Sequence, residues 1–581
     1  MEDNCHRESD VSYHEDNFKE SLDSYESGMD LTQMSSDSDL DFIFAGTSLA
    51  ADLAAWTSEF QVKHNAVDGL KLLKKHGHPQ LPSTARTLMR TAREVKTVEK
   101  SGMEYLHYPL KEKLVETLDR YPVQLVTDLD TLELSFNVDG LPLFKSSGKS
   151  MWPILCAVML SPVTIFPTAL TCGTKKPTDL AFLEDTVTDL TEVLTNGLDY
   201  RKKNIKVIVR CFVCDAPAKA LIKNTKCYSG YYGCERCTQR GIWLKRVTYQ
   251  ETAELNLRTD ASFRAQTQPE HHHGPTPLSD LPIDMVQSFP IDYMHQVCLG
   301  VTKKLLFIWC RGEKGMRISA GQVQEISSRL LQLKSSIPSI FARTPRGLDE
   351  LERWKATEFR QFLLYTGRLV LKDLYNHFLT FSVAIGLLVC PTLVQPHHHY
   401  AQNLLQYFVE KGCELYGATF LVYNTHTMLH LSTDAIRFKG LDNCSAFVFE
   451  NHLQTIKKMV RSGKNSLAQV ANRLEENLNR PIAQQKNKSS KKRKDQAYQL
   501  DDGESCEVVA MVEKEGKVLC RVYRHPEPLF SEPCSSFLVG VYKYEKRNMV
   551  MEWIPTTKIW RRAIQVERKS STIFMAVLHQ A

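Results

Sequence analysis

The chain has 581 residues, of which 43% are hydrophobic and 24% are charged. This length and composition are typical of a globular protein with about two to four domains and exclude a small disulfide scaffold. Residues 1–42 hold thirteen Asp and Glu against Arg7 and Lys19, a balance of −11, so the formal net charge of +6 leaves +17 for the remainder. A basic body of this kind favours a polyanionic partner such as nucleic acid.

Residues 1–45 are acidic, serine-rich and poor in large apolar side chains, which predicts a disordered tail. The tail lacks the apolar core of a secretory signal, so we expect the sixteen cysteines to be reduced and a CxxC pair to bind metal or carry redox chemistry. Two apolar stretches are unsuited to membrane spans, because residues 151–172 contain three prolines and residues 379–390 are too short. We therefore expect a soluble intracellular protein without a membrane partner.

Residues 46–125 have apolar side chains at helical spacing, which predicts a small helical region. From residue 131 the pattern changes to that of an α/β unit. A strand with alternating apolar residues turns at Asp139-Gly140, and apolar strands follow it. Residues 179–201 predict a helix, and the apolar run 205–214 predicts a buried parallel strand.

The second half of the chain is predicted to be mainly helical and to end in strands. Residues 246–420 are mostly helical, and residues 446–463 predict a helix with Glu450 near its start. The basic, Ser/Lys-rich segment 481–503 predicts a linker whose cationic cluster suits nuclear import or phosphate contact. Residues 504–581 alternate as short strands, which predicts a small separate β-rich module.

Three carboxylates are candidates for a catalytic site. Asp139 and Asp215 each follow a strand of the α/β unit, and a helix packed across the sheet can add Glu450. Three converging acids repel one another, so the natural occupant is a pair of Mg²⁺ or Mn²⁺ ions about 4 Å apart, which would promote phosphodiester displacement. The alternative is that each acid is a turn or surface residue; Asp215 would then cap the turn at Pro217.

Cysteines and histidines provide a candidate zinc site. Cys234 and Cys237 form a CxxC pair in a knuckle-like turn. His426 and His430 are four residues apart, so on a helix both project from one face. Together they supply the four ligands of a closed tetrahedral Zn²⁺ site, which would tie the turn after the second aspartate to the segment before the glutamate. The alternative is that the two pairs are unrelated. A second CxxC, residues 211–214, lies inside an apolar strand and is expected to be core.

Two further groups of polar residues have open roles. Asp292 and His295 lie three apart at a predicted helix start, where a helix cap beside a buried histidine and a role in the catalytic site are both compatible with the sequence. Lys457, Lys458 and Arg461 follow the third acid and are placed to contact phosphates.

The order of several motifs resembles that of the transposases of CACTA (En/Spm-like) DNA transposons. The resemblance covers roughly residues 75 to 475 and rests on five motifs in the same order. These are NVDGLPLFKSSGKSMWPIL, CDAPAKALIKNT followed by GCERC, IDYMHQVCLG, KATEFRQFLLY, and HTMLHLSTDAIRFKG followed by SAFVFENHLQTIKKMVR. Plant members of the family have an Asp-Gly before a Trp-Pro, an Asp-x-Pro-Ala before a CxxC, an Asp-x-Met-His, and later a His-rich stretch.

The resemblance implies a ribonuclease H-like catalytic core with a large helical insertion before the third acid. By position, Asp139, Asp215 and Glu450 match the three acids of such transposases. The related catalytic subunit of the V(D)J recombinase has a zinc site of a CxxC and two histidines in matching places, with a histidine spacing one residue wider. The expected organisation is an acidic tail (1–45), a helical N-terminal region (46–125), the first part of the core (126–245), a helical insertion (246–420), the end of the core (421–480), a basic linker (481–503) and a β-rich module (504–581).

Three hypotheses for the function follow. The first is an enzyme that cuts and joins double-stranded DNA at transposon ends and target, in the nucleus, as a homo-oligomer, with Mg²⁺ or Mn²⁺ at the three acids and a structural Zn²⁺. The second is a domesticated DNA- or chromatin-binding protein that keeps the fold without the activity. The third is a zinc-stabilised scaffold in which the acids have no role.

Overall fold

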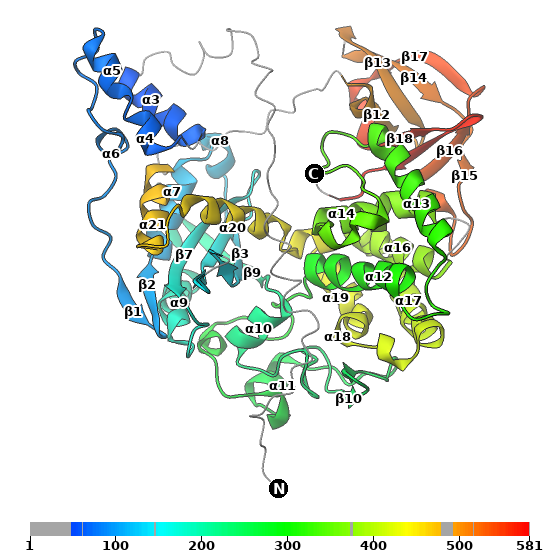
Figure 1. Cartoon of the computed structure of the whole chain (residues 1–581), viewed down its shortest axis with the longest axis horizontal. Coiled ribbons are helices and arrows are strands. Elements are labelled where there is room, and N and C mark those ends of the chain that lie inside the picture. Colours follow the sequence, from blue (N-terminus) through cyan, green and yellow to red (C-terminus); the bar gives the residue numbers. More distant parts are fainter. Residues whose placement is uncertain are drawn as a thin grey trace.

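The computed structural model describes residues 48–60, 62–144, 147–371, 376–477, 492–514 and 516–579. The predicted acidic tail, 1–45, and residues 481–491 of the predicted linker lie outside these ranges. The described chain is mixed α/β, with a mixed sheet between helices, a large helical region and a C-terminal β-rich region (Figure 1). No helix in the described ranges is both long and apolar enough to cross a bilayer.

The N-terminal region is helical at first and then contributes strands to the sheet. Its first helices are α3 (Leu49–Glu59), α4 (His64–Val67), α5 (Leu70–Lys75) and α6 (Ala85–Leu88). The prediction of helix throughout residues 46–125 is wrong for residues 98–107, which form the hairpin β1 (Val98–Lys100) and β2 (Met103–His107). Ser101 and Gly102 link the two strands, and both have positive φ, as a two-residue type I′ turn requires. The helices α7 (Leu110–Asp119) and α8 (Val123–Val126) follow.

The main sheet has the strand order β1-β2-β7-β6-β3-β9-β8, with the short β4–β5 hairpin beside β7. Strands β3 and β9 run parallel, and the other pairs are antiparallel. The strands after β2 are β3 (Thr131–Val138), β4 (Leu141–Pro142), β5 (Ser150–Met151), β6 (Ile154–Val158), β7 (Thr164–Gly173), β8 (Leu198–Tyr200) and β9 (Lys203–Phe212). The predicted strands on either side of Asp139 and before Asp215 are thus confirmed.

Helices cover both faces of this sheet. On one face, α7, α9 (Glu184–Asn196) and α10 (Ala216–Lys223) share a buried apolar cluster with the strands. On the other face, α20 (Phe447–Met459) and α21 (Ser466–Asn477) pack against β6, β7 and the end of β9, and Figure 1 shows α20 crossing the strands. Cys211 and Cys214 are both buried, which confirms the prediction that this CxxC is core.

Between the two parts of the sheet domain the chain forms a large, mainly helical region with its own core. The short hairpin β10 (Ile242–Trp243) and β11 (Val247–Thr248) precedes it. The apolar residues 379–390, which are too few to span a membrane, lie mostly in the buried helix α16 (Asn376–Val389). Its elements are α11 (Asp260–Arg264), the π-helix η4 (Tyr293–Thr302), α12 (Lys303–Arg311), α13 (Ala320–Gln332), α14 (Ala356–Gln361), the π-helix η7 (Phe362–Thr366), α15 (Gly367–Val370), α16 (Asn376–Val389), α17 (Pro391–Tyr416), α18 (Tyr423–His426), the 3₁₀ turn η9 (Thr427–His430) and α19 (Leu431–Arg437).

The C-terminal region is an antiparallel sheet of order β15-β16-β19-β18-β12-β13-β14-β17. Its strands are β12 (Ala497–Leu500), β13 (Ser505–Lys514), β14 (Lys517–Tyr523), β15 (Glu527–Pro528), β16 (Val541–Glu545), β17 (Met549–Pro555), β18 (Ile559–Glu567) and β19 (Ser571–Ala576). The region is β-rich as predicted, but it packs against the helical core, and Tyr365 Oη lies 2.6 Å from His579 Nδ1.

The described part of the predicted linker belongs to this sheet. Residues 497–500 form β12, which pairs with β13 and β18, so the prediction of a linker through residue 503 is wrong. Arg493, from the basic cluster, forms ion pairs with Glu507 and Glu567 of the same sheet. Its guanidinium is therefore engaged within the protein.

Candidate functional site

Asp139 immediately follows β3 and is half-buried. Its Oδ1 accepts a hydrogen bond from the backbone N–H of Gly140 at 2.6 Å. A side chain at residue 140 would meet the ring of Trp152, because an added Cβ would lie 2.9 Å from Cζ2. Glycine therefore lets the tryptophan ring close over the turn that presents the first aspartate.

Asp215 ends the neighbouring parallel strand and begins a helix. It is the N-cap of α10, and its Oδ1 accepts a hydrogen bond from the backbone N–H of Ala218 at 2.7 Å. The expected turn-capping role is thus real, and it fixes the orientation of the carboxylate. The register pairs Phe136 of β3 with Phe212 of β9. Each aspartate lies three residues beyond this last pair, and the charge of Asp215 acts on Asp139, so the two carboxylates lie near each other at this edge of the sheet.

Glu450 lies in the first turn of α20, as predicted. The start of this helix is held by Asp292, whose Oδ1 accepts a hydrogen bond from the backbone N–H of Ala446 at 2.8 Å. Ala446 is the N-cap of α20, and its carbonyl accepts a hydrogen bond from the backbone N–H of Glu450 at 2.8 Å. One buried carboxylate therefore positions the helix turn that carries the third acid.

The structure brings the three predicted acids into one electrostatic neighbourhood. The carboxyl groups of Asp139 and Glu450 lie close enough for each to influence the pKa of the other. Burial, followed by the carboxylates of Asp215 and Glu450, raises the pKa of Asp139 well above its ordinary value. Burial also raises the pKa of Glu450. Raised pKa values of neighbouring carboxyl groups mean that protonation of this pair is favoured where no cation offsets their charge.

His295 adds a positive group beside the acids. Its Nδ1 lies 2.6 Å from Asp292 Oδ2, and Asp292 is completely buried at the start of η4. Burial opposes the charge on His295, but Asp292, Asp215 and Glu450 raise its pKa to about 10. Asp292 also accepts hydrogen bonds from the backbone N–H groups of Met294 and His295, which confirms the predicted helix cap. The Asp292–His295 pair lies next to the acids as well, because Asp215 and Glu450 act on His295. Its signal in the sequence was the Asp-x-x-His spacing, which fits both.

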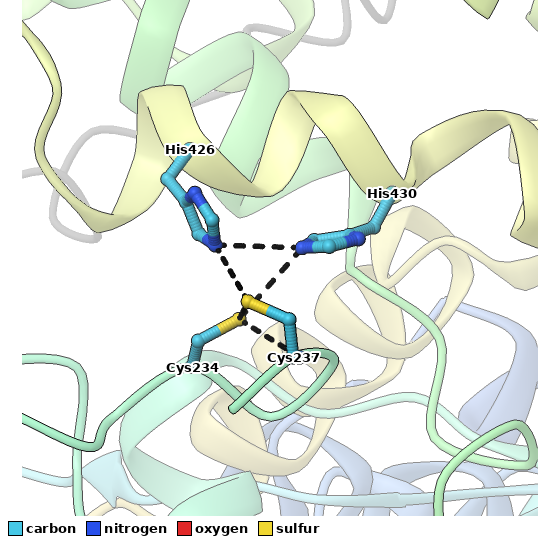
Figure 2. A group of neighbouring side chains, drawn as sticks. All are labelled: Cys234, Cys237, His426 and His430. Atoms are coloured by element: carbon cyan, nitrogen blue, oxygen red, sulfur yellow. Dashed lines mark hydrogen bonds between the residues drawn. The ribbon is translucent and has the colours of Figure 1, made fainter. Parts of the chain in front are cut away.

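The second candidate site joins Cys234, Cys237, His426 and His430, all of them buried. Their ligand atoms lie within 4.8 Å of one another. In the described part of the chain, no other group of three or more His, Cys, Asp or Glu side chains is this compact. The carboxylate oxygens of Asp139, Asp215 and Glu450 are therefore spaced more widely than the four atoms of this cluster. Figure 2 shows the imidazoles pointing from one helical segment toward the two sulfur atoms on a loop. That segment is α18 continued by the 3₁₀ turn η9, and it still projects both rings to one side.

The spacing of these four donors fits a tetrahedral zinc ion. Bonds of about 2.3 Å to sulfur and 2.0–2.1 Å to nitrogen place tetrahedral donors about 3.8 Å apart for two sulfurs, 3.6 Å for sulfur and nitrogen, and 3.3–3.4 Å for two nitrogens. The two Sγ atoms are 3.5 Å apart and the two Nε2 atoms 3.4 Å apart. The Sγ of Cys237 lies 3.2 Å from Nε2 of His426, and the Sγ of Cys234 lies 3.8 Å from Nε2 of His430.

The surroundings of Cys234 favour its thiolate form, which metal binding requires. The backbone N–H groups of Arg236 and Cys237 each donate to its Sγ at 3.4 Å. Burial opposes ionisation, but hydrogen bonds from Cys237 and the two histidines lower the pKa of the Cys234 thiol well below its ordinary value, whereas the hydrogen bond to Cys234 raises the pKa of the Cys237 thiol. The imidazole of His426 stacks on Tyr249 with ring centroids 4.7 Å apart, which fixes the plane of that ring.

Two buried ion pairs beside this cluster were not foreseen from the sequence. Glu235 and Arg236, the middle residues of the CxxC, are 7% and 4% exposed. Glu235 Oε1 lies 2.7 Å from the Nζ of Lys219 on α10, and Arg236 Nη2 lies 2.7 Å from Oδ1 of Asp434 on α19. The CxxC loop is therefore connected by one ion pair to α10 and by another to α19, the helix that follows His430.

No protein-family model matches the sequence, and no curated protein matches it.

Proposed function

We propose that the protein is a transposase, or an enzyme derived from one, that cleaves and joins DNA phosphodiester bonds with divalent cations held by Asp139, Asp215 and Glu450. The observation that carries this proposal is that Asp139 and Asp215 follow the adjacent parallel strands β3 and β9 and interact electrostatically with each other and with Glu450. Ligands of α/β sheets commonly bind at the carboxyl ends of such strands. The third acid, Glu450 on α20, lies close enough to the two aspartates for its pKa to respond to their charges.

The arrangement of the sheet supports a ribonuclease H-like core, the fold that the family resemblance implies. Strands β3, β6 and β7 form an antiparallel meander, and β9 then pairs parallel to β3 on its other side. The helical region lies in sequence between Asp215 and Glu450, as expected for an insertion before the third acid.

The chain's own groups have distinct parts in the proposed reaction. When bound, a pair of Mg²⁺ or Mn²⁺ ions activates a water or a 3′-hydroxyl and stabilises the leaving oxygen of the phosphodiester. Asp139 and Glu450 would both have to be deprotonated to hold the cations, so cation binding would compete with protonation of these two groups. The hydrogen bond from Ala218 keeps the Asp215 carboxylate oriented, and the Asp292–His295 pair holds a positive charge near the acids.

Zinc at the Cys234 cluster forms the structural part of the proposal. A closed Cys₂His₂ site has no open coordination position, so it stabilises the fold and does not react with substrate. It would fix the turn after Asp215 to the segment before Glu450, and so shorten the unrestrained chain between the second and third acids. Double-stranded DNA is the proposed substrate, and the nucleus is the corresponding location.

The test is nicking of supercoiled plasmid by the full-length, zinc-containing protein in Mg²⁺ or Mn²⁺. We expect conversion to the relaxed circle, lost in Asp215→Asn and in Glu450→Gln, because each change removes a charged ligand while keeping the side-chain shape. Glu313→Gln is the control, since Glu313 is an exposed carboxylate of the helical region. Nicking that persists in both site variants contradicts the proposal. A folded protein that binds DNA and does not nick it is the domesticated, silent binder.

A further inference from the structure

An open cavity lies between the N-terminal helices and the far end of α20. Its volume is about 650 Å³, and it is lined by Lys63, Asn65, Lys458 and Arg461. Lys458 ends the helix that carries Glu450, whereas Lys63 precedes α4, so two separate segments supply the lining. Lys63, Lys458 and Arg461 are all exposed to solvent.

The cavity is positively charged without a compensating acid in its lining. None of its four described lining residues is a carboxylate. Glu476 lines a small adjoining cavity, and this carboxylate is already engaged by His64 and by Arg473 at 2.6 Å. Burial, followed by the nearby charge of Arg473, lowers the pKa of Arg461. Glu476 partly opposes this shift, and the three cations among the four described lining residues make the cavity a candidate anion site.

Two lysines at the end of a helix also have a simpler explanation, because cations stabilise the negative end of the helix dipole. That explanation covers Lys457 and Lys458 on α20 and leaves out Lys63 and Arg461, which lie outside the helix. Amide and cationic donors from separate segments that face one cavity are the set that contacts phosphate oxygens in nucleic-acid complexes.

The position of the cavity relative to Glu450 indicates which anion it takes. Glu450 and Lys458 are eight residues apart on one helix, which corresponds to about 12 Å along its axis. At about 3.4 Å per nucleotide, this distance spans three to four steps of one DNA strand. A strand that ran along α20 from a phosphodiester at the three acids would therefore place a neighbouring phosphate at the cavity.

We infer that this cavity binds the phosphate backbone of substrate DNA a few nucleotides from the reacting bond, so that the N-terminal helices and α20 clamp the duplex together. The choice of DNA rests on the proposed function of the three acids. The contribution of Lys63 gives the N-terminal helices a part in substrate binding that no sequence motif indicated.

The test measures binding of a short labelled DNA duplex to the full-length protein by fluorescence anisotropy over a range of salt. Divalent cations are left out, so binding is measured whether or not the protein cleaves DNA. We expect weaker binding for Lys458→Gln/Arg461→Gln and for Lys63→Gln. The slope of log K against log salt should become shallower by about 0.9 for each phosphate that the variant no longer neutralises. Lys314→Gln/Lys334→Gln, which removes two exposed cations of the helical region, is the matched control and should bind as the wild type does.

Unchanged affinity and salt slope in the cavity variants, or an equal loss in the control, would overturn the inference. So would displacement of the DNA by polyglutamate of the same charge at the same concentration, because the cavity would then recognise any polyanion. Loss of binding in the cavity variants of a protein that nicks no plasmid would support the cavity and contradict only the catalytic proposal. Nicking of plasmid together with unaltered DNA binding in the cavity variants would support the catalytic proposal and contradict the inference about the cavity.

Discussion

Arg236 donates through Nη2 to both carboxylate oxygens of Asp434, at 2.7 and 2.8 Å, inside the protein. Asp434 Oδ2 also accepts a hydrogen bond from the backbone N–H of Ile291 at 2.8 Å. This pair therefore joins the CxxC turn, the segment before η4 and the helix that follows His430. The cluster of Cys234, Cys237, His426 and His430 brings together the CxxC turn and the segment that leads into this helix, so two sets of contacts connect these parts of the chain.

Breaking this pair from one side should be strongly destabilising. Arg236→Met leaves the Asp434 carboxylate buried without its cation, a loss of about 3–5 kcal/mol. Each kcal/mol lowers the melting temperature of a large domain by about 2–4 °C. Differential scanning calorimetry measures the shift. The double variant Arg236→Met/Asp434→Leu removes both charges and should recover most of the lost melting temperature. A double variant as unstable as Arg236→Met would show that altered packing, and not the lost ion pair, causes the loss.

Removing one sulfur ligand should release the zinc. Elemental analysis of the purified protein should find about one Zn²⁺ per chain in the wild type and much less in Cys234→Ser, because three donors no longer close the tetrahedral site. Cys227→Ser is the control, since Cys227 lies in the same loop and outside the cluster. Full zinc content in Cys234→Ser, or equal loss in both variants, would contradict the assigned ligand set.

Neutralising an acid of the candidate catalytic site should stabilise the protein in the absence of divalent cations. The pKa values of Asp139 and Glu450 are raised in the folded state, so it binds more protons than the unfolded chain. Stability from this source is complete below the ordinary pKa near 4 and is lost as pH rises through the raised values. Asp139→Asn should therefore melt a few degrees higher than the wild type at neutral pH.

The same experiment with Mn²⁺ gives the complementary result. The cation should raise the melting temperature of the wild type, because it binds only the folded state, and should raise that of Asp139→Asn much less. A chelator is avoided, since it would also remove zinc. A lower melting temperature for Asp139→Asn in cation-free buffer would show that the carboxylate stabilises the fold, contrary to the expected repulsion among the three acids.

His295 should give the protein a pH dependence on the alkaline side. Its pKa is raised to about 10, so its contribution to stability is complete below about 6.5 and is lost as pH rises through 10. The melting temperature of the wild type should fall over this range more steeply than that of His295→Asn. His452→Asn is the control, because burial lowers the pKa of His452 to about 4 and keeps it neutral throughout. Equal slopes for all three proteins would contradict a charged His295.

The positions of the acids could be predicted because each depends on local pattern. The alternating run before Asp139 and the apolar run before Asp215 define where two strands end, and the helical spacing around Glu450 defines its helix. The β3–β9 register, which brings the two aspartates near each other, depends on pairing between distant segments and leaves no local signal.

Other features could not be predicted because tertiary contacts override the local pattern. Arg236 sits between two cysteines, where a charged residue is usually solvated, and the partners that make its burial favourable, above all Asp434, come later in the chain. The hairpin at residues 98–107 could not be predicted, because its strands on either side of the Ser101-Gly102 turn are too short to show the alternation of apolar and polar residues that indicates a strand. Strand β12 follows a lysine-rich sequence that favours a linker, and it is held as a strand by pairing with β13 and β18, which come later in the chain.

The most direct test of the three-acid cation site is anomalous X-ray diffraction from crystals of the full-length protein grown with Mn²⁺, recorded at the zinc and manganese absorption edges. We predict a zinc peak among Cys234, Cys237, His426 and His430, and a separate manganese peak at the carboxylates of Asp139, Asp215 and Glu450. A manganese peak elsewhere, or none in crystals that show the zinc, would contradict the claim that the three acids form a cation site.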